Sequence, residues 1–392
     1  MTFSVSRDDG LEWAGASLSL LFCQRRNLFS PRFWRMLFDV IRFNTFAPDL
    51  LDQDDALESI GSYLEREGYS SAFRDDYLIP MTVAIWSAGP EKRALDVPAQ
   101  TLIHFLWNHH LLSTVSSRPQ WLTLKNCAQS YVDAIIPKLP AENVFLSTPV
   151  RSLMNEPSGK VRLLLQNGTT ALYDGVVLAT HGDQAYSIVE HTATQEEHEV
   201  LSVFETKRNR AVLHSDASLL PRNPLARSSC NYISGSTSDT GGGDEVCLTY
   251  DMSSLQNIPR RTFGDVLLTL NPNRPPRPET VQAEMEYSHP VYTSQTVAAQ
   301  QRLQEVQGVR GIWYAGAWTG FGFHEDGWVS GLKAAEGFGA VVRWVEERYR
   351  KRRVGFQRRI LRMVVWALQR LVVRRLERMF GGAGGRDREK LD

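Results

Sequence analysis

The residues best suited to chemistry stand together near the C-terminal end of the chain, at His324, Glu325 and Asp326. Histidine titrates near neutral pH, so His324 is a candidate proton donor or acceptor. The two carboxylates come directly before a stretch with helical spacing, where acidic side chains are favoured by the helix dipole. Capping of that helix is sufficient to explain Asp326, so the acidic pair alone does not indicate catalysis.

A short apolar strand and a glycine-rich loop are expected to position these three residues. Residues 312–315 carry no charge, as is typical of a buried parallel strand. Gly316, Gly320 and Gly322 allow the backbone to turn sharply and to approach a ligand closely. From about Gly327 small residues recur at helical spacing, namely Ser330, Gly331, Ala334, Ala335 and Gly339. A helix with such a face can pack against a sheet or a cofactor ring, and its free N–H groups suit a partly anionic atom.

The stretch from Gly311 to Ala335 resembles the C-terminal flavin-contacting motif of the FAD-dependent amine oxidase superfamily, which includes protoporphyrinogen oxidase and phytoene desaturases. The similarity runs from about Phe3 to Gly339, and it specifies the family far better than the substrate. Five further segments look like one fungal and bacterial branch of that superfamily: Arg25-Arg-Asn-Leu-Phe-Ser-Pro31, Ala84-Ile-Trp-Ser87, Phe105-Leu-Trp-Asn-His-His110, Val177-Leu-Ala-Thr-His-Gly-Asp183 and Tyr287-Ser-His-Pro290.

The resemblance implies that the cofactor is FAD, and it places three groups of residues around it. The backbone of the first group meets the flavin diphosphate and ribityl region: Gly316, Ala317 and Trp318. The second group approaches the adenine and ribose: Val150, Ala179 and Thr180. The third lines the flavin face, with the histidine as the candidate catalytic residue: His324, Glu325, Asp326, Gly327 and Trp328. Because a flavin itself accepts the hydride, the protein has to supply only orientation and electrostatics.

The sequence departs from the family pattern in two places. Many members carry an acidic residue where this chain has Ala317, so only backbone contacts to the cofactor would remain there. The Gly-x-Gly-x-x-Gly turn that cradles a dinucleotide diphosphate does not occur in the sequence. Phe3 to Trp13 instead predict a hairpin of the substrate domain, with its turn at Asp9-Gly10. We therefore expect the ADP-binding βαβ unit to be absent from this chain. The alternative to cofactor binding is that the glycine loop after residues 312–315 serves only helix–strand packing.

The expected fold is α+β or α/β, with a partial FAD-binding Rossmann-like domain interleaved with a mixed helix-and-sheet substrate domain and a C-terminal amphipathic helix. Residues 1–140 form the mainly helical part of the substrate domain, and residues 199–304 form its sheet. Residues 141–198 and 305–342 return to the FAD domain, and residues 343–392 form a basic tail. Individual strands are expected from Val144, after the hairpin signal Asn167-Gly168, and at 176–179, 211–214, 246–250 and 266–270. Helices are expected to begin at Ser30-Pro31 and after His181, and residues 234–244 are expected to form a loop.

Composition limits the class of protein. The 392 residues carry 44 basic and 44 acidic side chains, and a hydrophobic content of 42% is ample for a core. Four scattered cysteines without a Cys-x-x-Cys pair argue against a metal cluster or a disulfide framework, and favour a reducing, cytoplasmic location. Adjacent His109 and His110 point apart on a helix, so a metal site there is not predicted. No N-terminal signal and no run of 18 apolar residues occurs.

The net charge of the whole chain is zero, but its C-terminal tail is strongly basic. Residues 343–378 contain 13 Lys or Arg and 3 Glu, a net charge of +10. Apolar residues recur there every three or four positions: Ile360, Met363, Val364, Ala367, Leu368, Leu371, Val372 and Met379. Such a helix, over residues 343–380, is typical of a peripheral contact with an anionic membrane surface. The alternatives are packing on the protein's own surface or on another subunit. No nucleic-acid-binding module accompanies the charge, so that partner is not predicted.

Two functions from different classes remain open. The first is a flavin-dependent oxidoreductase of the amine oxidase superfamily that acts on an apolar, lipid-like substrate. The second is a truncated, catalytically inactive flavoprotein fragment that only binds a partner or a membrane. The aromatic residues Trp86, Phe105 and Trp107 are expected in the core, although the resemblance places them toward a substrate cavity.

Overall fold

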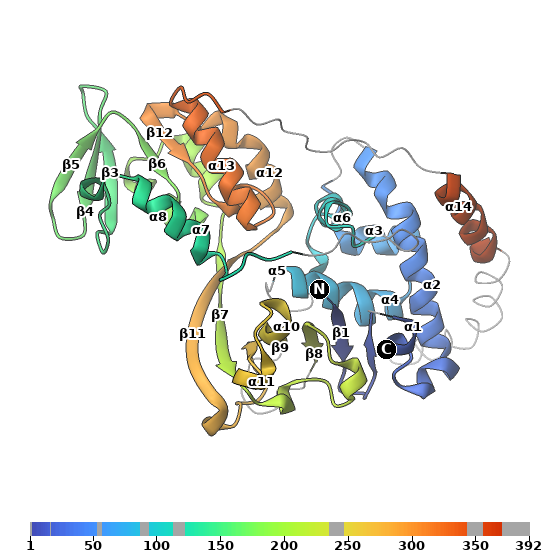
Figure 1. Cartoon of the computed structure of the whole chain (residues 1–392). Helices are drawn as coiled ribbons and strands as arrows, with labels where there is room; N and C mark the ends of the chain where they lie inside the picture. The colour runs from blue at the N-terminus through green and yellow to red at the C-terminus, as the bar shows by residue number, and fades with distance from the viewer. Residues whose placement is uncertain are drawn as a thin grey trace, which may run out of the picture.

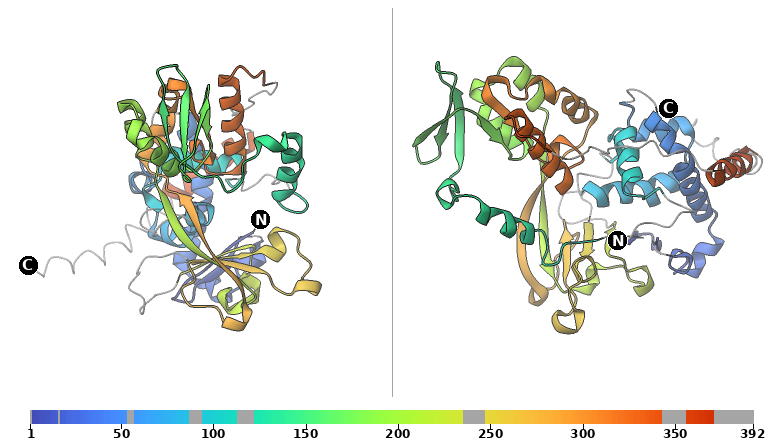
Figure 2. Two further views of the ribbon diagram at one scale, coloured as in Figure 1. Left: turned by 90° about the vertical axis from the view of Figure 1, so that its left-hand side faces the viewer. Right: turned by 45° about the horizontal axis from the view of Figure 1, so that its top comes forward.

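The computed structural model describes residues 2–15, 17–52, 57–86, 94–112, 122–234, 247–342 and 356–370. These residues form a large sheet covered by helices and a second, smaller lobe (Figure 1). Two long strands, β7 (Thr206–His214) and β11 (Val281–Pro290), run from the large sheet toward the smaller lobe, as both views in Figure 2 show.

The large sheet has seven strands in the order β11-β7-β10-β9-β8-β1-β2. Its other members are β10 (Leu267–Leu270), β9 (Cys247–Asp251), β8 (Cys230–Ile233), β1 (Phe3–Ser6) and β2 (Glu12–Ala14). Neighbouring strands are antiparallel except β1 and β8, which pair in parallel. The hairpin expected at the start of the chain is confirmed, with Val5 opposite Trp13. Both side chains are buried, because helices cover this part of the sheet.

A helical layer packs on this sheet and builds the largest apolar core. It contains α1 (Leu18–Leu21), α2 (Pro31–Phe46), α3 (Ile60–Glu67), α4 (Ser71–Phe73), α5 (Ile79–Trp86) and α6 (Ala99–Asn108). Helix α2 begins as the sequence predicts, since the Ser30 hydroxyl accepts a hydrogen bond from the Phe33 amide at 3.2 Å and Pro31 occupies the first turn. Phe43, Phe73, Leu102 and Ile103 fill the space between these helices.

Two predictions for residues 144–173 have different outcomes. The hairpin signal Asn167-Gly168 is confirmed, because it joins β4 (Val161–Leu165) to β5 (Thr170–Tyr173), with Gly168 at φ 83°. The prediction of a strand from Val144 is wrong, because the first strand of this region, β3 (Val150–Asn155), begins only at Val150. A 3-10 turn at residues 141–143 and a left-handed Ser147 at φ 52° keep the preceding backbone from extending.

The smaller lobe also holds a parallel pair, β6 (Val176–Leu178) and β12 (Ile312–Tyr314). The helices α8 (Gly182–Val189), α9 (Gln195–Leu201), α12 (Ser294–Arg302) and α13 (His324–Gly337) belong to the same lobe. The buried parallel strand predicted at 312–315 and the helix predicted after His181 are therefore confirmed. Short helices α10 (Met252–Leu255) and α11 (Arg260–Phe263) lie beside β9 and β10.

The outer edge of β12 is closed by the residues that precede the strand. The amide of Ile312 donates to the Val309 carbonyl, and the Ile312 carbonyl accepts from the Gly308 amide at 2.8 Å. The side chain of Gln307 bonds both backbone groups of Tyr314, accepting at 2.9 Å and donating at 2.8 Å. Backbone groups that would pair with a neighbouring strand are thus satisfied locally.

The described part of the basic tail is α14 (Phe356–Leu368), which lies along the outer side of α2 (Figure 1). Residues 343–355 and 371–392 of the tail, and all of the loop predicted at 234–244 except its first residue, lie outside the described residues. Within the described ranges, no helix has the length and apolar content needed to cross a membrane.

Candidate functional site

The loop after β12 meets the loop after β6 at the carboxyl ends of the two parallel strands. Gly316 follows β12 with φ 145°, and its amide donates to the Ser330 hydroxyl at 2.8 Å. The Trp318 indole N–H donates to the Thr180 carbonyl at 3.0 Å, which ties the two loops together. A side chain at position 316 would lie 2.5 Å from the Trp318 nitrogen and 3.0 Å from the Thr180 oxygen, so only glycine fits. In open parallel sheets this edge is where ligands usually bind.

Helix α13 begins at His324, three residues earlier than the small-residue spacing predicts, so His324, Glu325 and Asp326 form its first turn. The carboxylate of Asp326 accepts a hydrogen bond from the Phe323 amide at 3.0 Å. This bond satisfies an amide at the helix start, where the dipole also favours an acidic side chain. A side chain at Gly320 would collide with the same carboxylate, so Asp326 is held firmly by its surroundings.

An open cavity of about 780 Å³ lies beside this helix start. One wall comes from α13 and the loop before it, and the other comes from α7 (Gln129–Ile135). The lining residues are Tyr131, Ile135, Ala317, Gly322, Phe323, His324, Glu325, Gly327 and Trp328. The volume lies within the range of roughly 300–1,000 Å³ that small-molecule sites occupy.

A tyrosine and a histidine meet at the wall of this cavity. The hydroxyl of Tyr131 lies 3.0 Å from Nδ1 of His324, and the two rings meet edge to face at 89°. Sequence reasoning missed Tyr131, which is 193 positions away from His324. The only local signal is the spacing of Tyr131 and Ile135, which places both on one face of α7. The pair can pass a proton between a phenol and an imidazole at the cavity wall.

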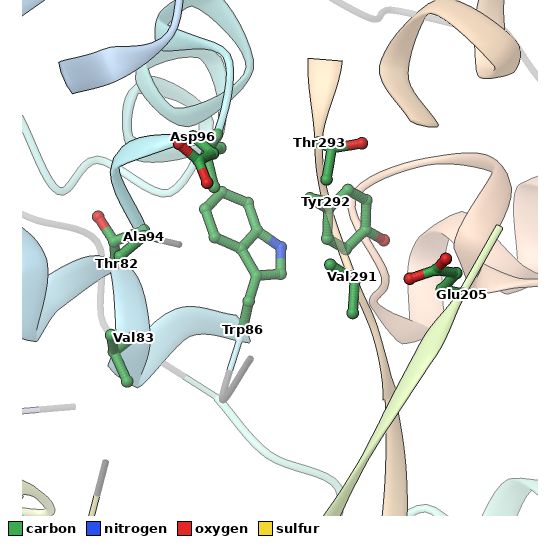
Figure 3. Close-up of a pocket in the computed structure, with 10 residues that line it drawn as sticks. Thr82, Val83, Trp86, Ala94, Asp96, Glu205, Val291, Tyr292 and Thr293 are labelled. Atoms are coloured by element: carbon green, nitrogen blue, oxygen red, sulfur yellow. The ribbon is translucent and has the colours of Figure 1, made fainter. Parts of the chain in front are cut away.

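A second cavity, of about 230 Å³, lies between α5 and the ends of β7 and β11 (Figure 3). Its lining residues are Thr82, Val83, Trp86, Ala94, Asp96, Val97, Glu205, Val291, Tyr292 and Thr293. The hydroxyls of Thr82 and Tyr292 are buried, and neither has a hydrogen-bond partner in the part of the chain that the structure describes. Burial, reinforced by the nearby Asp326 charge, raises the pKa of Tyr292, so its phenol stays protonated.

An aromatic cluster separates the two cavities. Trp86 packs on Tyr292 at 5.6 Å and on Phe105 at 5.5 Å between ring centroids. Phe105 stacks in turn on Phe323 at 5.0 Å, and Phe323 lines the larger cavity. The Trp86 indole also donates to the Phe321 carbonyl at 2.9 Å, which fixes this loop against α5. Trp86 and Phe105 are therefore core residues, as the sequence predicts, and Trp86 also lines a cavity.

Comparison with known proteins decides the family. A family model described as flavin containing amine oxidoreductase matches residues 19–210. The chain belongs to the FAD-dependent amine oxidase superfamily. No curated protein sequence matches this chain.

Several solved structures share the fold. A CLA-producing fatty acid isomerase from P. acnes has a TM-score of 0.55 and 13% identity, over 87% of this chain and 80% of the isomerase. A putrescine oxidase has a TM-score of 0.53 and 12% identity, over 86% and 81% of the two chains. Cyclohexylamine oxidase from Brevibacterium oxydans IH-35A has a TM-score of 0.51 and 14% identity, over 86% and 79%. Identities this low establish the fold and leave the substrate open.

The structure brings some of the residues predicted from the superfamily motif together and places others elsewhere. Those that line the larger cavity are Ala317, His324, Glu325, Gly327 and Trp328. Thr180 and Gly316 lie at the strand ends, whereas the Trp318 ring is only 3% exposed and packs on Phe204 in the core. Ala179 is exposed just after β6, and Val150 begins β3 against the core of the smaller lobe.

The described residues fit the two ends of FAD unequally. The size of the larger cavity and its aromatic walls, Phe323 and Trp328, suit an isoalloxazine ring. Ala317 and the first turn of α13 line the same cavity. For the diphosphate, the described residues offer no Gly-x-Gly-x-x-Gly turn. The fit is therefore good for the ring and incomplete for the diphosphate.

Proposed function

We propose that this chain is an FAD-linked oxidoreductase that acts on an apolar, lipid-like substrate. The observation that carries the proposal is the 780 Å³ cavity at the start of α13, whose walls include Ile135, Phe323 and Trp328. The fold shared with a fatty acid isomerase supports a lipid-like substrate, although at 13% identity it is support from the fold alone. When bound, FAD would supply hydride acceptance.

The residues around the cavity would bind and orient the substrate. Apolar walls favour a hydrocarbon chain, because its burial removes apolar surface from water. Carboxylates lie at both cavities, from Glu325 at the larger one and from Asp96 and Glu205 at the smaller one. These charges would repel a carboxylate, so a neutral head group suits the site better than a fatty acid anion. The Tyr131 hydroxyl and His324 Nδ1 would hold or move one proton beside it.

Titration of the purified chain with FAD tests the cofactor. Flavin fluorescence should be quenched on binding, and replacing Trp328 by Ala should weaken binding about tenfold by removing a cavity wall. Trp366→Ala is the matched control, because Trp366 is 52% exposed on α14 while Trp328 is 58% exposed. Binding that is equally affected by the two substitutions would place FAD elsewhere on the surface.

The substrate is tested on the FAD-loaded chain without oxygen. Oleyl alcohol should bleach the flavin absorbance, whereas oleic acid should do so more slowly and putrescine should not. Bleaching by putrescine alone would contradict the lipid-like substrate and leave the flavin assignment intact.

One observation favours the second candidate, a catalytically inactive flavoprotein fragment that only binds a partner or a membrane. Within the described residues, the parallel sheet of the smaller lobe has only β6 and β12, and no strand with a diphosphate turn pairs with the other edge of β6. A folded chain that binds no FAD at any concentration would support this candidate over the oxidoreductase.

A further inference from the structure

Helix α14 packs on α2 through one side only. Val365 is 2% exposed, and the guanidinium of Arg362 pairs with Asp49, donates to the Thr45 carbonyl and lies 5.5 Å from the Phe46 ring. These contacts give the helix a fixed orientation, with Arg362 and Val365 on the side that faces the protein.

The opposite side of α14 is apolar and exposed. With 3.6 residues per turn, Ile360 and Met363 lie roughly half a turn from Val365, and Val364 and Leu368 lie about 100° and 60° from it. All four residues are exposed, with 42–63% of each residue accessible. Trp366 is also exposed, with the Arg370 guanidinium 4.3 Å from the centre of its ring. One side of the helix thus forms an ionic contact with the protein. The exposed apolar residues, here called the apolar row, are Ile360, Met363, Val364 and Leu368.

The positive charge of the tail indicates which kind of partner binds the apolar row. Residues 343–378 carry a net charge of +10, so a second copy of the same segment would be repelled. An anionic bilayer offers both the opposite charge and an apolar layer at the depth a surface helix reaches. Tryptophan is favoured at that depth, because its ring is amphipathic. We propose that α14 is a docking surface for anionic lipid, with its apolar row inserted and its Arg362–Asp49 side holding the enzyme at the membrane.

Vesicle co-sedimentation of the full-length chain tests the proposal. The probes are vesicles of pure phosphatidylcholine and of phosphatidylcholine with about one third phosphatidylserine. The chain should pellet with the anionic vesicles and be released as salt rises from 0.1 to 1 M, because the screening length falls from about 10 to about 3 Å. Replacing Met363 and Val364 by Ser should weaken binding at least tenfold. Phe263→Ser is the control, since Phe263 is 62% exposed on α11, far from α14 in Figure 1.

Each outcome supports or overturns the proposal that α14 binds anionic lipid. Selective loss in the Met363→Ser/Val364→Ser variant, with unchanged thermal unfolding, supports the lipid surface. Equal pelleting of this variant, the control and the unchanged chain overturns it. Light scattering tests the alternative that a second copy of the chain binds the apolar row. If the unchanged chain is a dimer that does not bind vesicles, and the same two substitutions convert it to a monomer, the apolar row is a dimer interface and the lipid proposal is overturned. A variant that fails to fold is replaced by Ile360→Ser, which leaves the side that contacts α2 intact.

Discussion

The side-chain amide of Gln307 forms two hydrogen bonds with the backbone of Tyr314, and in doing so it takes the place of a neighbouring strand. Tyr314 is buried, so these backbone groups have no water to replace a lost partner. The relationship explains how the sheet of β6 and β12, as seen in the described residues, can end at β12.

Replacing Gln307 by Leu should therefore destabilise the protein. The substitution leaves one buried N–H and one buried C=O unsatisfied, at a cost of about 1–3 kcal/mol in the free energy of unfolding. Urea denaturation measures the change. Gln195→Leu is the control, because Gln195 lies at the exposed start of α9, and it should change stability by no more than about 0.5 kcal/mol. Equal stability of the two variants would show that Gln307 does not close the edge.

The pair Tyr131 and His324 should matter for turnover and little for stability. Tyr131→Phe removes only the hydroxyl that lies 3.0 Å from Nδ1 of His324. We expect flavin reduction by substrate to slow by about 10²-fold or more, which is typical of a lost proton-transfer group, with unchanged FAD affinity. Stopped-flow absorbance measures the rate. Tyr173→Phe, at an exposed residue of β5, is the control, and a Tyr131→Phe rate equal to it would remove the pair from the chemistry.

A buried carboxylate just after the end of β7, at Asp216, predicts an acid-sensitive fold. Burial alone would raise the pKa of Asp216, but hydrogen bonds from the amides of Arg277 and Ser218, together with the Arg277 guanidinium, lower it below its usual range. A lowered pKa in the folded state means that the ionised form stabilises the fold. That contribution is present above the ordinary Asp pKa of about 3.9 and is lost as the pH falls below it.

Asp216→Asn should accordingly remove part of this dependence. At pH 7 the variant should be about 1–3 kcal/mol less stable, and the difference from the unchanged chain should shrink as the pH falls below about 4. Thermal unfolding between pH 3 and 7 measures it. Asp174→Asn, at a side chain that is 90% exposed, serves as the control. A difference that stays constant with pH would mean that the carboxylate charge contributes nothing.

The sequence predicts the elements whose signals are local. The charge-free strand at 312–315, the Asn167-Gly168 hairpin and the Ser30-Pro31 helix start each depend on neighbouring residues, and all three are observed. The strand predicted from Val144 fails because apolar alternation ignores the left-handed Ser147. The contacts of Tyr131 with His324, and of Gln307 with β12, follow from chain packing, which residue spacing does not encode. The family motif concerns the backbone of Trp318 and does not predict that its ring is buried in the core, which also follows from chain packing.

Two glycines near the site provide the sharpest test of how the loop after β12 works. Gly316 has φ 145°, and a methyl group there would meet the Trp318 indole and the Thr180 carbonyl. Gly316→Ala should therefore cost at least about 1–3 kcal/mol through backbone strain, and more through the collision. Gly331 lies inside α13 with open space where a methyl group would go, so Gly331→Ala should stabilise the protein by about 0.5–1 kcal/mol.

Thermal unfolding compares the stability of the two variants, and FAD titration then separates the roles of the loop after β12. A Gly316→Ala variant that remains folded but loses FAD would assign the loop to the cofactor, whereas one that loses stability and keeps its FAD affinity would assign it to packing alone.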